Sequence, residues 1–218
     1  MQYFCALMTI ELNGRAATLL YEKALYLHDE ELLVIADVHL GKASHFRKAG
    51  IPIPAGAQMS DFDNLACLFN KTKPKTVYFL GDLFHSSFNR DWHYFCDLIG
   101  AFPHIAFVLV KGNHDLIKKS MYKELCVEVV ERIENDAFVF THDRVADVPA
   151  GKLNIVGHIH PGVVLSGMGR QSIKLPCFYL TETYMLLPAF GVLTGLYSMD
   201  RSKSSQIYIV LQDGIKRL

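Results

Sequence analysis

The sequence lacks the features that would send the chain to a membrane or out of the cell. No apolar run reaches the length of a membrane span, because Glu11 interrupts the first one, and no basic segment of the kind that opens a signal peptide stands at the N-terminus. The cysteines number five, are scattered and form no CxxC pair, so they fit neither a disulfide framework nor a zinc knuckle. We expect a cytoplasmic protein with reduced cysteines and no membrane association.

An excess of charge is also missing, since Lys plus Arg and Asp plus Glu each number 22. No general basic surface for nucleic acid is therefore expected, although divalent cations bound to carboxylates would make one region attractive to phosphate. No repeat and no linker rich in Pro, Gly or Ser divides the chain. Half of its 218 residues are hydrophobic, which predicts a single domain over 1–218.

Short apolar runs are what the sequence contains instead. The N-terminal part predicts β-hairpins, with one turn at Asn13-Gly14. Later runs without polar alternation predict strands buried on both faces, at 32–36, 76–80, 105–110, 137–141 and 153–157. Helices are predicted near 55–70, 89–102 and 116–125, and further strands within 174–212. The fold class is therefore predicted as α/β, with ends richer in β-structure.

Each of the five central runs is followed by a polar cluster. The clusters are Asp37 with His39, Gly81-Asp82, GNHD at 112–115, Thr141-His142, and GHIH at 157–160. In open α/β sheets, ligands bind beyond the carboxyl ends of the strands, so these clusters are expected to converge on one crevice. His158 and His160 stand two residues apart and can point to the same side, while Gly157 allows close approach of the backbone.

The residue types in these clusters indicate metal binding. A single cluster is weak support, because Gly-Asp turns are common and an isolated histidine is usually structural, but all five occur in order. Imidazole nitrogens mixed with hard oxygens suit manganese, iron or zinc better than calcium or magnesium. Seven candidate ligands are too many for one tetrahedral ion, whereas two ions sharing a carboxylate fit. The candidates are Asp37, His39, Asp82, Asn113, His142, His158 and His160.

The ordered set DVH, GDLFH, GNHD, H and GHIH resembles the calcineurin-like metallophosphoesterase superfamily. The resemblance implies a four-layer αββα sandwich with two divalent ions, for which we favour manganese over iron, zinc or nickel. It implies one ion on Asp37, His39 and His160, a second on Asn113, His142 and His158, and Asp82 as the bridge. It also implies that a metal-bridging hydroxide attacks phosphorus in line, that His114 protonates the leaving oxygen, and that Asp115 orients the His114 ring.

Three flanking segments carry a narrower resemblance. HLGKASHFRKAGIPIPAG (39–56), GRQSIKLPCFYL (169–180) and LPAFGVLTG (187–195) are similar to the bacterial ligase-associated DNA damage response endonucleases, called PdeM. That resemblance implies DNA as the phosphodiester substrate, a role in DNA repair, and an ATP-dependent DNA ligase and a DEXH-box helicase as partners. No base-reading motif is visible, so DNA is favoured by the resemblance alone.

Cationic residues flank the predicted metal ligands on both sides. Lys42, His45 and Arg47 follow the first cluster and Arg170 follows the last, and all four are interpreted as substrate-positioning residues. His85, in GDLFH, is given the same interpretation. Three alternatives stay open beside a DNA endonuclease: a phosphodiesterase for a small nucleotide-type substrate, a phosphomonoesterase, and an interaction subunit of a repair complex.

Overall fold

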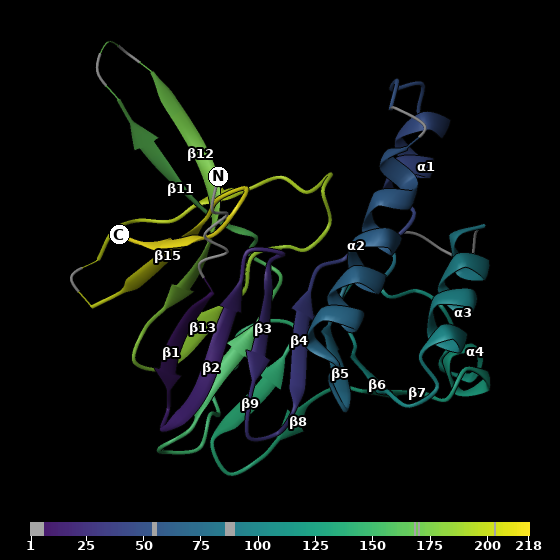
Figure 1. The fold of residues 1–218 in the computed structure, drawn as a ribbon, viewed down its shortest axis with the longest axis horizontal. Coiled ribbons are helices and arrows are strands. Elements are labelled where there is room, and N and C mark those ends of the chain that lie inside the picture. Colours follow the sequence, from purple (N-terminus) through teal and green to yellow (C-terminus); the bar gives the residue numbers. More distant parts are fainter. Residues whose placement is uncertain (1–6, 54–55, 86–89, 168, 170, 203) are drawn as a thin grey trace.

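The computed structural model describes residues 7–53, 56–85, 90–167, 169, 171–202 and 204–218. Two β-sheets lie face to face, and helices cover the outer face of the first sheet (Figure 1). The first sheet has the strand order β1-β2-β3-β4-β5-β6-β7. Its strands are β1 (Met8–Leu12), β2 (Arg15–Leu20), β3 (Ala24–Leu27), β4 (Leu32–Ala36), β5 (Thr76–Leu80), β6 (Ala106–Val110) and β7 (Val127–Val130).

This sheet changes from antiparallel to parallel along its order. Strands β1 to β4 form antiparallel hairpins, and Asn13 and Gly14 turn the first one with φ of +50° and +79°, the left-handed conformations that a tight hairpin turn needs. Strands β4 to β7 are parallel, with Ala36 opposite Leu80 and Leu80 opposite Val110. The loops that follow β4, β5 and β6 therefore leave the sheet at the same edge.

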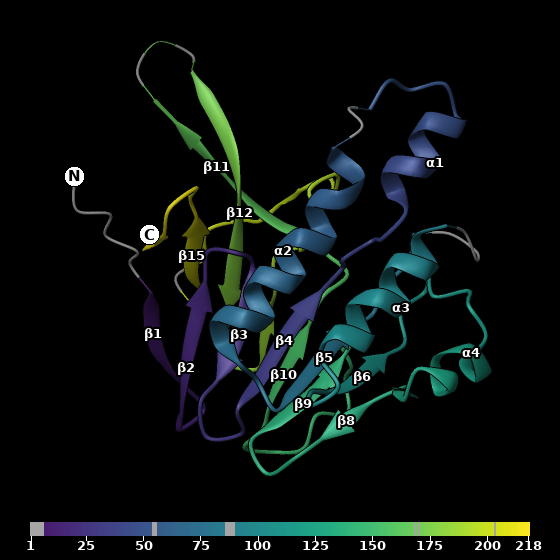
Figure 2. The ribbon, with the colours of Figure 1, turned by 45° about the vertical axis from the view of Figure 1, so that its right-hand side comes forward.

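Four helices occur in the described residues: α1 (Lys42–Lys48), α2 (Ala57–Thr72), α3 (Asp91–Ala101) and α4 (Lys119–Glu124). Figure 2 shows α2 and α3 lying across the parallel strands. Leu65, Leu68 and Phe69 of α2 recur at helical spacing and are fully buried in the core between the helices and this sheet. Among the described helices, none combines the length and apolarity needed to span a membrane, and the longest, α2, has 16 residues.

The second sheet has the order β14-β11-β12-β13-β10-β9-β8, and β12 also pairs with β15, which pairs with β16. Its central strands β9, β10 and β13 are parallel, with Thr141 opposite Val156. The core between the two sheets contains Val34 and Leu80 from the first and Phe140 from the second. The strands are β8 (Ile133–Glu134), β9 (Phe138–Thr141), β10 (Leu153–Val156), β11 (Pro161–Ser166), β12 (Ser172–Leu180), β13 (Tyr184–Leu186), β14 (Tyr197–Ser198), β15 (Gln206–Val210) and β16 (Ile215–Arg217).

The predicted α/β class and the five central strands are confirmed to within one residue at each end. Among the described residues, however, the helices lie on the first sheet's side only, so the second helical layer of the expected four-layer sandwich is missing. The reason is connectivity: β10 leads into the β11–β12 hairpin, and β12 reaches β13 through the short turn at 181–183. These connections are too short to form a crossover helix.

Candidate metal centre

Backbone hydrogen bonds hold the first two clusters side by side. The loop after β4 continues the parallel pairing with the loop after β5: His39 N–H donates to Asp82 O at 2.9 Å and Leu40 N–H to Leu83 O at 2.8 Å. His85 N–H then donates to Leu40 O at 3.0 Å. The loops that carry the DVH and GDLFH motifs are therefore fixed to each other at the edge of the sheet.

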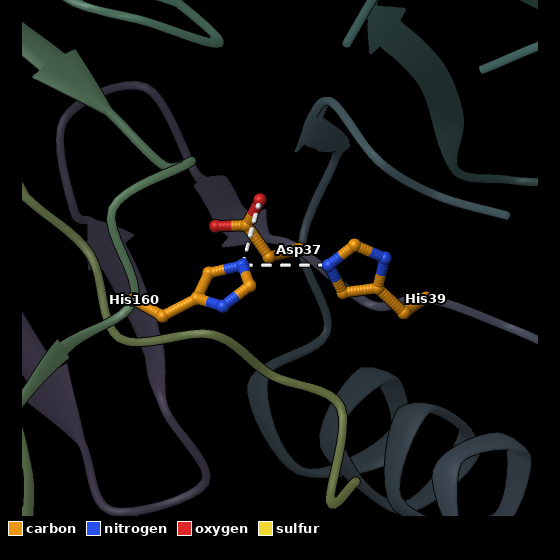
Figure 3. A group of neighbouring side chains, drawn as sticks. All are labelled: Asp37, His39 and His160. Carbon is orange, nitrogen blue, oxygen red and sulfur yellow. Dashed lines mark hydrogen bonds and ion pairs between the residues drawn. The ribbon is translucent and has the colours of Figure 1, made fainter. Parts of the chain in front are cut away.

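The first metal-binding group consists of Asp37, His39 and His160 (Figure 3). The Nε2 atoms of the two histidines lie 3.3 Å apart, and Asp37 Oδ1 lies 3.6 Å from His160 Nε2. One ligand atom from each residue falls within 4.8 Å of the others. Two residues come from the first sheet and His160 from the second, so the group forms only where the two sheets meet.

The second group consists of Asp82, His142 and His158, with the same mutual limit of 4.8 Å between ligand atoms. His142 Nε2 lies 3.1 Å from His158 Nδ1 and 3.6 Å from Asp82 Oδ1. Asn113 Oδ1 lies 2.9 Å from the same His142 nitrogen. All four side chains predicted for this end of the site are therefore brought together.

Asp82 faces both groups with different oxygen atoms. Its Oδ1 is directed at His142, as above, and its Oδ2 lies 3.9 Å from His39 Nε2. One carboxylate oriented in this way can bind two cations at once, which is the geometry expected of the predicted bridge.

The donor atoms fit divalent cations. Asp37 is 0% exposed, and its Oδ1 has no hydrogen-bond partner among the described residues. A buried carboxylate oxygen without a partner is costly unless a cation neutralises it. Burial, with Lys42 and His160 nearby, also lowers the pKa of His39, which keeps its ring neutral and its lone pair available. Four imidazoles and two carboxylates in this arrangement are a donor set for transition-metal ions.

Hydrogen bonds from outside the two groups fix the orientation of the ligands. His142 Nδ1–H donates to Leu80 O at 3.0 Å, which leaves Nε2 as the metal-facing atom. His158 N–H donates to Asp37 Oδ2 and His114 N–H to Asp82 Oδ1, each at 2.8 Å. Each carboxylate is thus held by a backbone amide: Asp37 keeps Oδ1 free of hydrogen bonds within the described residues, and Asp82 directs Oδ1 at His142 and Oδ2 at His39.

Two of the motif glycines are required by space. A Cβ on Gly157 would lie 2.6 Å from Asp37 Oδ2, and a Cβ on Gly112 would lie 2.4 Å from Asp82 Oδ1. Both distances are far below van der Waals contact, so the glycines in GHIH and GNHD make room for the carboxylates. The predicted close approach at Gly157 is confirmed.

A row of three further imidazoles lies beside the metal-binding groups. The rings of His85 and His114 stack with centroids 5.8 Å apart, and those of His45 and His85 meet edge to face at 4.9 Å. The His114 side chain is exposed, and His85 is half-buried. Burial, Lys42 and His45 lower the pKa of His85 to about 4, so this ring is neutral near pH 7. The row gives hydrogen-bonding groups to any phosphate that reaches the metals.

Asp115 has a different place from the predicted one. Its Oδ1 accepts hydrogen bonds from Leu83 N–H and Phe84 N–H at 2.9 and 3.4 Å, and its Oδ2 accepts one from Gly112 N–H at 2.8 Å. Within the described chain, its carboxylate makes no hydrogen bond with the His114 ring. Asp115 therefore joins the loops after β5 and β6, and the predicted orientation of the His114 ring by Asp115 is wrong for this structure.

The predicted cationic residues differ in their relation to the site. Lys42 is partly buried, close to Asp82 and Asp37. Burial lowers the pKa of its ammonium group, and the negative charges of the two carboxylates partly offset this. Arg47 is exposed on α1, and its Nε–H donates to Ala43 O at 3.3 Å. Arg170 lies outside the described residues. Lys42 is thus the predicted cation that the structure brings nearest the metal-binding carboxylates.

Sequence reasoning missed a clamp on the far side of Asp37. Gly191 N–H donates to Asp37 O at 3.2 Å. The segment 190–192 is held in turn by two side chains. Asp61 Oδ1 accepts a hydrogen bond from Val192 N–H at 3.2 Å, and Lys23 Nζ donates one to Phe190 O. Burial lowers the pKa of Lys23 to about 8 and raises that of Asp61 to about 6. No local motif marks either residue, because a lysine in a hairpin turn and an aspartate in a helix are both common.

Comparison with known proteins agrees with this geometry. The model of the calcineurin-like phosphoesterase family matches residues 31–184. None of the curated proteins compared with the chain matches it. Among solved structures, the nuclease MPE of Pseudomonas putida is similar, with a TM-score of 0.78 and 26% sequence identity over 98% of this chain and 100% of the nuclease chain. Since the family match covers more than half of its length, the chain belongs to the calcineurin-like phosphoesterase family and is a metal-dependent phosphoester hydrolase.

Proposed function

We propose that the protein is a nuclease that hydrolyses phosphodiester bonds in DNA. The observation that carries the proposal is the pair of metal-binding groups joined by Asp82, with the exposed His114 ring beside them. The similarity to a nuclease over 98% of this chain supports a nucleic acid as the substrate class, and DNA is favoured by the sequence resemblance.

The ligands of the proposed centre are Asp37, His39 and His160 for one ion, Asn113, His142 and His158 for the other, and Asp82 between them. We favour manganese for both ions. Two such ions, when bound, lower the pKa of a water molecule and neutralise charge on the scissile phosphate. The protein supplies the fixed donors, because backbone amides hold Asp37 and Asp82 in place.

We assign His114 as the general acid that gives a proton to the leaving oxygen. Its backbone N–H is bound to Asp82 Oδ1, so the residue is fixed relative to the bridge, and its ring is exposed to an incoming substrate. The neighbouring rings of His85 and His45 and the ammonium group of Lys42 are assigned to positioning of the phosphate. Arg47 and Arg170 keep the positioning role that the sequence predicts for them.

Hydrolysis of three substrates in parallel tests the proposal. Manganese-loaded protein is given bis(p-nitrophenyl) phosphate, p-nitrophenyl phosphate and labelled single-stranded DNA. We expect the wild type to cleave the diester and the DNA. His114→Ala is expected to retain the metal and lose most turnover, whereas Asp82→Ala is expected to lose both metal and turnover. Wild-type turnover in His114→Ala would remove His114 from the reaction. Cleavage of the diester without DNA would indicate a small nucleotide-type substrate, and cleavage of the monoester alone a phosphomonoesterase.

The biological setting extends the proposal. We place the reaction in DNA repair in the cytoplasm, with an ATP-dependent DNA ligase and a DEXH-box helicase as partners, on the strength of the sequence resemblance. Co-purification of tagged protein with either enzyme from a bacterium that contains all three tests this, and absence of both from the purified material would count against it.

A further inference from the structure

A cavity of about 400 Å³ lies next to the GNHD loop, whose Asp115 lines it. It is formed where the ends of β6 and β7 meet the loop 115–118 and α4, which lies beyond this end of the first sheet (Figure 2). The volume is within the usual range for sites that hold small ligands. The lining residues are Leu109, Lys111, Asp115, Leu116, Ile117, Lys118, Lys119, Tyr122, Val129, Val130 and Glu131.

The Tyr122 hydroxyl group in this cavity is buried and unpaired. Tyr122 is 1% exposed, and its oxygen has no hydrogen-bond partner in the described part of the chain. Leaving a buried hydroxyl without a partner costs about 1–3 kcal/mol. The neighbouring Asp115 carboxylate does not serve it: its oxygens accept the backbone amides of Leu83, Phe84 and Gly112, and no hydrogen bond joins it to Tyr122 in the described residues. Its hydrogen-bonding capacity is therefore unused at the wall of the cavity.

The charge around the cavity favours an anionic ligand. Lys111, Lys118 and Lys119 are exposed at its rim and outnumber the exposed carboxylate there, that of Glu131. Leu116 is 68% exposed and offers an apolar surface at the same opening. Cations, a hydroxyl donor and an apolar surface together match the phosphate and the base or sugar of one nucleotide.

The cavity lies one to three strands away from the metal-binding carboxylates along the same sheet edge. Asp37 and Asp82 follow β4 and β5, while the cavity is at the ends of β6 and β7, next in the parallel order. Neighbouring strands lie about 4.8 Å apart. Asp115, which lines the cavity, belongs to the same loop as Asn113 and His114, so a strand held at the metals can continue over this loop towards the cavity.

We propose that this cavity binds the nucleotide next to the scissile phosphate, with its flanking phosphate held by Lys118, Lys119 and the Tyr122 hydroxyl. The inference rests on the proposed function and adds a specific subsite to it. It explains why an enzyme without an excess of basic residues can retain a DNA strand: the cations are concentrated beside the metals.

Kinetics on two substrates test the subsite. Tyr122→Phe removes only the hydroxyl, and Lys118→Gln with Lys119→Gln removes the rim charges. For a single-stranded oligonucleotide we expect KM to rise about three- to tenfold in Tyr122→Phe and about tenfold in the lysine double variant, with kcat little changed. For bis(p-nitrophenyl) phosphate, kcat/KM is expected to stay within about twofold. Lys123→Gln, on α4 but outside the cavity, is the matched control.

An unchanged KM for the oligonucleotide in both variants would overturn the subsite, and so would an equal loss on both substrates, which would indicate a structural role. Failure of the wild type to cleave DNA would instead refute the proposed function. A binding measurement separates the two cases.

Trp92 provides that measurement without catalysis. It is the one tryptophan of the chain, and its ring centroid lies 5.2 Å from that of Tyr122. We expect 5′-thymidine monophosphate to change its fluorescence saturably in metal-free protein, with the dissociation constant raised several-fold by the lysine double variant and unaffected by Lys123→Gln. No saturable change, or the same curve in the double variant, would overturn the subsite whatever the enzyme cleaves.

Discussion

Five ligands of the proposed metal centre have backbone conformations that residues other than glycine rarely adopt. The φ angle is +53° at Asp37, +52° at His39, +49° at Asp82, +66° at His158 and +53° at His160. Each such conformation costs about 1–3 kcal/mol. The cost is tolerated because paired loops hold the backbone, as in the hydrogen bond from His39 to Asp82, and because it turns the side chains inward. Among the described residues, ten residues other than glycine have a positive φ, and five of them are these ligands.

The space beside Asp37 yields a prediction at Gly157. In Gly157→Ala, the new Cβ must displace the Asp37 carboxylate from 2.6 Å, so we expect a loss of manganese affinity of at least tenfold and a destabilisation of about 1–3 kcal/mol. Gly100→Ala in α3 is the control, because its Cβ would meet nothing within 4 Å. Calorimetric titration with manganese measures the affinity, and urea unfolding of the metal-free protein measures the stability. Wild-type affinity in Gly157→Ala would show that the carboxylate does not need its present position.

Asp61 yields a prediction about pH. Burial raises its pKa from 3.8 to about 6, so the folded protein keeps a proton on Asp61 that the unfolded chain releases between these values. Stability is therefore lost as pH rises from about 4 to 6, by an amount on the order of 2 kcal/mol. Asp61→Asn retains an acceptor for Val192 N–H but cannot ionise. We expect the free energy of unfolding of the wild type minus that of Asp61→Asn to decrease as the pH rises from about 4 to 6.

Urea unfolding of metal-free protein at pH 4, 5 and 6 measures this difference. A constant difference between wild type and Asp61→Asn would mean that Asp61 is already ionised in the folded protein throughout the window.

At the scale of elements, the parallel strands were the most predictable part of the molecule. The runs at 32–36 and 76–80 match β4 and β5 residue for residue, because strands buried on both faces are apolar throughout. The clusters after them converge as predicted, since parallel strands end at one edge. The helix α1 was not predicted: it has 7 residues, starts after Gly41 in a left-handed conformation and lacks a side-chain cap.

Features that depend on distant packing could not be predicted from local patterns. Asp115 follows His114 directly, yet the loop after β5 captures its carboxylate. The Lys23–Asp61 clamp and the Tyr122 cavity are each assembled from residues far apart in sequence or without a motif of their own. The lack of helices on the second sheet, within the described residues, follows from connection lengths that a list of strands does not reveal.

Helix α1 places Lys42 close to the carboxylates of Asp37 and Asp82 and yields a prediction for that element. We expect Lys42→Gln to lower kcat/KM for bis(p-nitrophenyl) phosphate about tenfold, because a partly buried charge near Asp37 and Asp82 is lost. Arg47→Gln should lower it less, about twofold to threefold, since the guanidinium bonds back to its own helix. Initial rates at two salt concentrations test this order. Equal losses in the two variants would place the functional charge of α1 elsewhere.

At the scale of the whole molecule, the two groups of the proposed metal centre each take residues from both sheets. Asp37, His39 and Asp82 come from loops of the first sheet, and His142, His158 and His160 from loops of the second. The ligands are therefore assembled only in the folded sandwich, and metal binding and folding must be coupled.

This coupling predicts stabilisation by metal. Manganese at 100 times its dissociation constant should add about 2.7 kcal/mol to the free energy of unfolding and raise Tm by roughly 5–10 °C. Chelation should reverse the rise, and Gly100→Ala should behave like wild type. Differential scanning calorimetry measures the change. A Tm that does not respond to manganese in wild type would show that the two sheets are not linked through the metals.

The most direct test of the account is the number of manganese ions bound per chain in wild type and in Asp82→Asn, measured by elemental analysis after equilibrium dialysis. Because Asp82 faces both groups, we predict two ions in wild type and at most one in the variant, while Gly100→Ala keeps two. A single ion in wild type, or two ions retained without the Asp82 carboxylate, would contradict a bridged pair of metals at the junction of the sheets.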